Sequence, residues 1–128
     1  MKNSDQLRRA LRANAAFSIL TGTLGLVAAS QVVELLGTGS QAIVRLVAGG
    51  LLGFAAFVLW VSFRPEPQLR TEALLISIGD FGWVAISVVL IALGLFSTGG
   101  AVSAALVALI VLGFGTAQLR ARNAIASR

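Results

Sequence analysis

Asp80 is the residue whose type and position could do chemistry in this chain of 128 residues. It lies well inside the apolar stretch 71–96, which is long enough to cross a bilayer as a helix. A charged carboxylate at such a depth costs about 3 kcal/mol on insertion scales, so we expect Asp80 to face the protein interior. Two interpretations follow. The acid is either a proton or cation site, as in a coupled carrier, or a structural residue that stabilises helix packing through hydrogen bonds.

The predicted partners of Asp80 are hydroxyl groups. Ser77 shares its helix face, while Ser18 and Thr21 of the first apolar stretch lie at a matching predicted depth. We predict that Ser18 and Thr21 donate hydrogen bonds to the carboxylate. The alternative is that an arginine side chain reaches inward and neutralises the acid, and the candidates are Arg12, Arg64 and Arg120.

Most catalytic chemistry is excluded by composition. The chain has no cysteine and no histidine, which removes disulfides, thiolate and imidazole metal ligands, and Ser-His or Cys-His nucleophiles. The five acidic residues are scattered, and no two share the spacing of an acid/base or metal site. No phosphate-binding loop or dinucleotide fingerprint is present. We therefore expect no enzyme activity, no catalytic residues, no metal and no cofactor.

Four long apolar stretches account for a hydrophobic content of 57%. A soluble domain of this size cannot bury so much apolar surface, and the stretches lack the alternating polarity of a membrane β-barrel. The sequence predicts an all-α integral membrane protein, a four-helix transmembrane bundle that forms a single domain over residues 1–128. The predicted spans are about 13–36, 41–63, 71–96 and 101–119, with a proline-containing polar loop at 64–70.

The basic residues predict the orientation. Arg45 stands alone on one side of the predicted spans, and nine basic residues fall on the other. These nine are Lys2, Arg8, Arg9, Arg12, Arg64, Arg70, Arg120, Arg122 and Arg128. Because basic residues are retained in the cytoplasm, we expect both termini and the loop 64–70 to be cytoplasmic. The same distribution explains the net charge of +5 by topology and lipid headgroup contacts, so we expect no nucleic-acid partner.

A weak internal repeat relates the second and fourth spans. A shift of sixty residues aligns 35–60 with 95–120, and the identical pairs include Thr38 with Thr98 and Phe54 with Phe114. Such a repeat predicts two helical hairpins of the same orientation. The alternative is shared membrane composition combined with a common turn chemistry.

Small residues mark the predicted helix contacts, because they let helix backbones approach closely in a membrane. The predicted packing positions are Gly25, Gly49, Gly53 and Gly113.

Two further sites are predicted near the membrane surfaces. Glu34 and Arg45 flank the first tight hairpin at similar depth, so we expect them to form an ion pair on the periplasmic side. Trp60 and Trp83 are interpreted as interfacial aromatic residues.

The segment 79–84, Gly-Asp-Phe-Gly-Trp-Val, follows the polar proline-containing loop. It resembles the third helix of uncharacterised small four-span bacterial membrane proteins, which carry an Asp-x-x-Trp step at that place. The resemblance implies four spans and a bacterial inner membrane, and it brings no known activity.

The expected function is a non-enzymatic one based on helix packing, as an accessory subunit of a membrane assembly or as a small homo-oligomer. The expected partners are membrane lipids and other membrane protein subunits. The alternatives are a small proton- or cation-coupled transporter or channel that uses Asp80, and a protein that binds a lipid or hydrophobic ligand between its helices. A cavity that reaches Asp80 would favour these two alternatives, whereas an acid enclosed by neighbouring side chains would favour a purely structural role.

Overall fold

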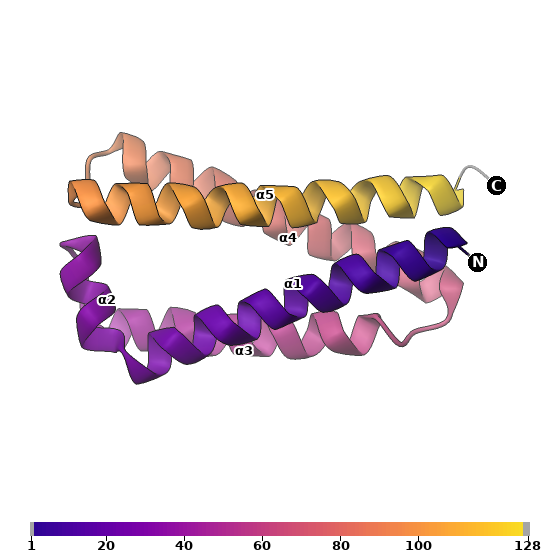
Figure 1. The fold of residues 1–128 in the computed structure, drawn as a ribbon, viewed down its shortest axis with the longest axis horizontal. Helices are drawn as coiled ribbons and strands as arrows, with labels where there is room; N and C mark the ends of the chain where they lie inside the picture. Colours follow the sequence, from indigo (N-terminus) through magenta and orange to yellow (C-terminus); the bar gives the residue numbers. More distant parts are fainter. Residues whose placement is uncertain (1, 127–128) are drawn as a thin grey trace.

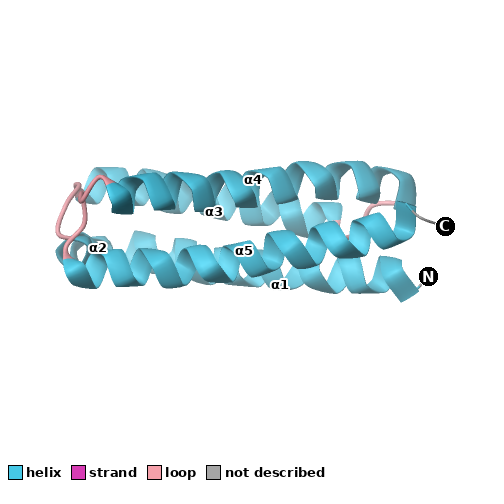
Figure 2. Cartoon of the chain, turned by 90° about the horizontal axis from the view of Figure 1, so that it is seen from above, coloured by secondary structure: helices cyan, strands magenta, loops and turns pink. Residues whose placement is uncertain are grey.

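The computed structural model of the protein describes residues 2–126, and helices fill almost all of that range. Four long helices run side by side along the bundle, and a short one lies at the end opposite the termini (Figure 1). Loops occur only at the two ends of the bundle (Figure 2). In chain order the helices are α1 (Lys2–Val27), α2 (Ala29–Leu36), α3 (Gln41–Val61), α4 (Glu66–Ala92) and α5 (Thr98–Ala126).

Both termini and the α3–α4 loop lie at one end, called the terminal end below; α2 and the α4–α5 loop lie at the far end (Figure 1). Of the basic residues counted for topology, Arg128 and the side chain of Lys2 lie outside the described part of the chain.

The predicted all-α class and four-helix bundle are confirmed. Four helices are long and apolar enough to cross a membrane, which makes this a multi-pass membrane protein by length and composition. These spans are Asn3–Val27, Gln41–Val61, Glu66–Ala92 and Thr98–Ile125. Three of the four extend beyond the predicted apolar stretches because polar residues continue the helices at the terminal end.

The α4 helix shows how its ends are set. It begins at Glu66, five residues earlier than predicted, because Pro67 falls in the first turn, where a missing N–H removes no helical hydrogen bond. It ends at Ala92, and Gly94 just beyond adopts a positive φ of 70°, a conformation that glycine takes without strain.

The first predicted span, 13–36, is not one helix. Ala28 has φ −115° and ψ 36°, which ends α1 and starts the separate helix α2. The α2 helix leans towards the start of α5, where Ser97 donates from its backbone N–H to Leu36 O at 2.9 Å and from its hydroxyl to Leu35 O at 2.8 Å. These two bonds satisfy carbonyl groups at the end of α2 and join the two halves of the chain at the far end.

Two helical hairpins build the bundle, as predicted: α1 packs on α3, and α4 packs on α5. The hairpins meet mainly through α1 and α5, whereas α3 and α4 touch little. A buried apolar cluster fills the terminal end and contains Leu7, Leu11, Ala15, Val58, Val61, Leu69, Ala73, Ile76, Ala121 and Ile125. The packing between the hairpins is therefore closest at the terminal end.

Within the chain, the predicted packing role of glycine is correct at Gly25 alone. A Cβ added there would lie 2.7 Å from the Cβ of Ala48 on α3, so the two helices need a hydrogen at this position. Gly49, Gly53 and Gly113 make no close helix contact within the chain, because an added Cβ at each would meet no atom within 4 Å. Ala48 faces α1, and a turn of 100° per residue carries Gly49 away from that contact.

The predicted ion pair between Glu34 and Arg45 is wrong. Both side chains are exposed, and the ion pair found within residues 2–126 joins Arg64 to Glu72 at 3.2 Å. The break at Ala28 sets α2 at an angle to α1, so Glu34 no longer continues the face of α1 that packs on α3.

We predict that Gly25→Ala and Gly49→Ala change stability in different ways. The first should lower the free energy of unfolding by about 1–3 kcal/mol, because its methyl group overlaps that of Ala48. The second should leave stability unchanged or raise it by up to about 1 kcal/mol, since alanine favours a helix over glycine. Thermal unfolding of both variants in mild detergent measures the difference. Equal losses would contradict the α1–α3 contact.

Candidate functional site

Asp80 lies in the interior of the bundle, as predicted, and is only 3% exposed. Two side-chain amides hold it: Asn14 of α1 donates from Nδ2 at 3.0 Å, and Gln118 of α5 donates from Nε2 at 2.9 Å. Both hydrogen bonds end on the same carboxylate oxygen, Oδ2. Three helices are therefore tied together at one atom.

The two amides are also hydrogen-bonded to each other, and Gln118 is hydrogen-bonded to Ser77, one turn before Asp80 in α4. Asn14 Nδ2 donates to Gln118 Oε1 at 2.8 Å, and Gln118 Nε2 donates to Ser77 Oγ at 3.3 Å. Ser77 in turn donates to the carbonyl oxygen of Gly115 at 3.4 Å. Each amide nitrogen thus has an acceptor for both of its hydrogens, which fixes the nitrogens towards Asp80.

The predicted donors to Asp80 are wrong, although Ser77 belongs to the site. Ser18 donates to Asn14 Oδ1 at 3.5 Å, and Thr21 donates to the carbonyl oxygen of Phe17 at 2.8 Å. Both hydroxyls are used within α1, which is the usual outcome for serine and threonine inside a helix.

The arginine alternative is also wrong, because none of the three candidate arginines donates a hydrogen bond to Asp80. Arg12 donates to Ser62 and lies 4.5 Å from the ring centroid of Phe63. Arg64 pairs with Glu72, and Arg120 is exposed.

The sequence does not assign Asn14 and Gln118 to the site. A depth counted from the first or last apolar residue of each stretch places both near the membrane surface. Because α1 begins at Lys2 and α5 continues to Ala126, both amides lie well inside their helices. Their residue type was the available signal, because an amide among apolar residues needs a hydrogen-bond partner in the bundle.

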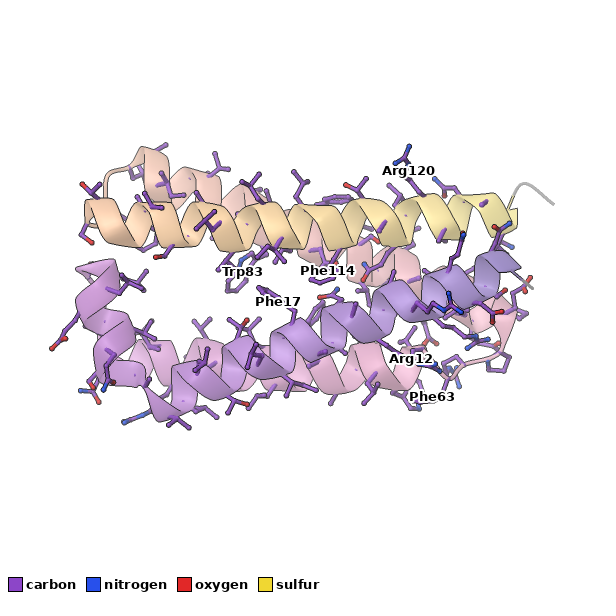
Figure 3. All side chains as sticks on the ribbon, viewed as in Figure 1. Arg12, Phe17, Phe63, Trp83, Phe114 and Arg120 are labelled. Carbon is purple, nitrogen blue, oxygen red and sulfur yellow. The ribbon has the colours of Figure 1, made fainter. Side chains whose placement is uncertain are left out.

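A cavity of about 290 Å³ lies beside Asp80 between the two hairpins and is lined by residues of α1, α3, α4 and α5. Apart from Asp80, Asn14 and two hydroxyls of α1, its walls are mainly apolar, with the aromatic rings of Phe17, Phe54 and Trp83. Figure 3 shows Phe17 and Trp83 in the space between α1 and α5.

The rim of the cavity includes Val47, which is 43% exposed, and the exposed Gly50. The cavity therefore opens through the side of the bundle next to α3.

Two polar atoms of residues that line the cavity have no hydrogen-bond partner. Within residues 2–126 no hydrogen bond reaches Asp80 Oδ1, and this oxygen is not among the fully enclosed atoms. The Trp83 Nε1–H is enclosed and has no acceptor. An unpaired donor inside a protein costs free energy, and because this nitrogen is enclosed it is not exposed at the cavity surface.

The two tryptophans occupy different surroundings. Trp83 lies on the cavity wall, nine residues before the last residue of α4, and its interfacial placement stays a prediction. Trp60 lies at the end of α3, is 51% exposed and has the Arg64 guanidinium 4.4 Å from its ring centroid.

Comparisons of the chain with protein-family models, with curated proteins and with solved structures found no match. In the described part of the chain, no group of three or more acidic side chains could hold a metal ion. The site at Asp80 thus combines a carboxylate oxygen that accepts no hydrogen bond from residues 2–126 with a mainly apolar cavity that opens at the side of the bundle.

We predict a strong energetic coupling between Gln118 and Asp80. Gln118→Met preserves length but removes a donor to Oδ2, and should lower the free energy of unfolding by about 1–3 kcal/mol. In an Asp80→Leu background the same change should cost less, with a coupling of about 0.5–3 kcal/mol. The control is Gln68→Met, since Gln68 is exposed. A cost for Gln118→Met that is the same in both backgrounds would contradict the network.

Proposed function

We propose that the protein is a non-enzymatic membrane protein that binds a small, largely apolar ligand in the cavity beside Asp80. The observation that carries this proposal is the cavity itself, which is lined by the ring of Trp83 and by the buried Asp80, one of whose carboxylate oxygens accepts no hydrogen bond from the described residues. A single buried acid with no second acid or base beside it is a poor basis for catalysis, which supports a binding role.

The size and walls of the cavity support a small ligand. Ligand pockets in proteins start at about 300 Å³ and are mostly apolar with a few placed polar groups. The volume of about 290 Å³ is near that lower limit. A suitable ligand has an apolar body for the aromatic walls and one polar end for Asp80.

The ligand enters from the membrane in this proposal. The apolar cluster at the terminal end separates the cavity from that surface, and at the far end α2 is held to the start of α5 by Ser97. The open side at Val47 and Gly50 lies midway along α3. This arrangement supports a site for a membrane-dissolved compound over an aqueous channel.

The proposed location is a bacterial inner membrane with both termini in the cytoplasm. This orientation is supported by the basic residues, because the single Arg45 lies near the start of α3 at the far end, while the other described basic residues lie towards the terminal end. The likeness of 79–84 to small four-span bacterial proteins supports the membrane. Lipids are the proposed neighbours, and nucleic acid is not a proposed partner.

A packing role, as a homo-oligomer or accessory subunit, is the second candidate. It is supported by Gly49, Gly53 and Gly113, which face outward with open space around them and so offer surfaces for close helix contact. Single-molecule photobleaching in bilayers reports the oligomeric state. Single bleaching steps throughout would remove the homo-oligomer.

The binding proposal is tested with two probes of the same shape, the cation benzyltrimethylammonium and its neutral isostere neopentylbenzene. The reporters are the two indole N–H signals in a ¹⁵N NMR spectrum of the protein in detergent. We expect the Trp83 signal to shift saturably with at least one probe. The Trp60 signal, far from the cavity, is the internal control for unspecific binding.

Two glycine variants of α3 make the test specific to the cavity. Gly50 lines the cavity and has open space beside it, so Gly50→Leu should fill the site and weaken binding by about tenfold or more. Gly53 also has open space but does not line the cavity, so Gly53→Leu should leave affinity unchanged. Absence of a Trp83 shift with both probes, or equal effects of the two variants, would overturn the proposed function.

A further inference from the structure

We propose that the ligand is an organic cation, and that its charged nitrogen is bound by Asp80 Oδ1 with the aromatic rings of the cavity around it. This inference rests on the proposed function and adds the sign of the ligand's charge. It goes beyond the cavity itself, because a pocket of this size and polarity also suits neutral compounds.

The first argument is the missing counter-charge of Asp80. Its partners Asn14 and Gln118 are neutral amides, and both donate to Oδ2 alone. Of the three arginines considered as partners, Arg12 is bonded to Ser62, Arg64 is paired with Glu72, and Arg120 is exposed. A buried carboxylate without an opposite charge is unfavourable, so a cation in the cavity would supply the interaction that the protein itself does not.

The second argument is that one oxygen of Asp80, Oδ1, accepts no hydrogen bond in the part of the chain that the structure describes. Because the amides occupy Oδ2, Oδ1 remains available at the cavity wall without any change in the network. A cation bound there leaves the Asn14–Gln118 contact intact, so binding does not compete with the interaction that joins the helices.

The third argument is the aromatic content of the walls. Phe17, Phe54 and Trp83 come from three different helices and line the same cavity as Asp80. Aromatic faces attract cations through the ring quadrupole, and quaternary ammonium groups are bound in this way. Apolar walls that contain rings and a single acid fit an alkylated ammonium group better than a hydrated metal ion, which needs several oxygen ligands.

The experiment compares the two isosteric probes in the wild-type chain and in Asp80→Asn. The probes differ only in a positive nitrogen in place of a carbon. Asparagine keeps the shape of the side chain and an oxygen that Asn14 and Gln118 can donate to, and the variant's fold is checked by its unchanged Trp60 signal. Site binding is taken as the saturable Trp83 shift that is lost in Gly50→Leu.

We expect the wild-type protein to bind benzyltrimethylammonium at least about tenfold more tightly than neopentylbenzene, a difference of about 1.4 kcal/mol. In Asp80→Asn this preference should disappear, through weaker binding of the cation and unchanged binding of the neutral probe. Equal affinities in the wild type, or a cation preference that survives in Asp80→Asn, would overturn the inference while leaving the proposed function in place. If neither probe produces a Trp83 shift sensitive to Gly50→Leu, the proposed function fails and this inference fails with it.

Discussion

Two amide side chains that converge on one oxygen of a buried carboxylate are the interaction on which this structure depends. In a bilayer there is no water to satisfy a polar group, so Asp80, Asn14 and Gln118 must satisfy one another or raise the cost of insertion. Each comes from a different helix, so the requirement can be met only when α1, α4 and α5 are assembled. The hydrogen bonds therefore select one arrangement of the two hairpins among many that would bury apolar surface equally well.

The cavity is a consequence of where the bundle is held together. The apolar cluster fixes the terminal end, Ser97 fixes the far end against α2, and the Asp80 network lies between them without any group from α3. Because α3 and α4 touch little, aromatic side chains rather than close helix contact define the space at mid-bundle. Further closure of α3 on α4 would bury Asp80 Oδ1 without a partner, at a cost in free energy.

Much of the architecture follows from the sequence. Long apolar stretches require helices in a membrane, the hairpin order follows from short loops, and a lone acid must face inward because lipid cannot solvate it.

The predicted glycine contacts and the predicted partners of Asp80 depend on which face of each helix meets its neighbour and on where each helix ends. A stripe of small residues gives no information about which side of α3 meets α1, so the contact predicted at Gly25 is found, whereas Gly49 and Gly53 make none within the chain. Depth counted from apolar boundaries missed Asn14 and Gln118, because α1 and α5 continue beyond those boundaries. The helix break at Ala28 could not be predicted, because that position holds neither glycine nor proline. The short helix α2 that follows the break is held by hydrogen bonds from Ser97, in the other half of the chain.

The most direct measurement of the central interaction is ¹⁵N NMR of the side-chain amides of Asn14 and Gln118 in a bilayer mimetic. The structure places Asn14 Nδ2 2.8 Å from Gln118 Oε1, and both amide nitrogens within 3.0 Å of Asp80 Oδ2. The account predicts nuclear Overhauser contacts between the two amide groups, slow exchange of their protons with solvent, and displacement of both signals in Asp80→Leu. Amide protons that exchange as fast as those of exposed Gln68, with no contact between Asn14 and Gln118, would contradict it.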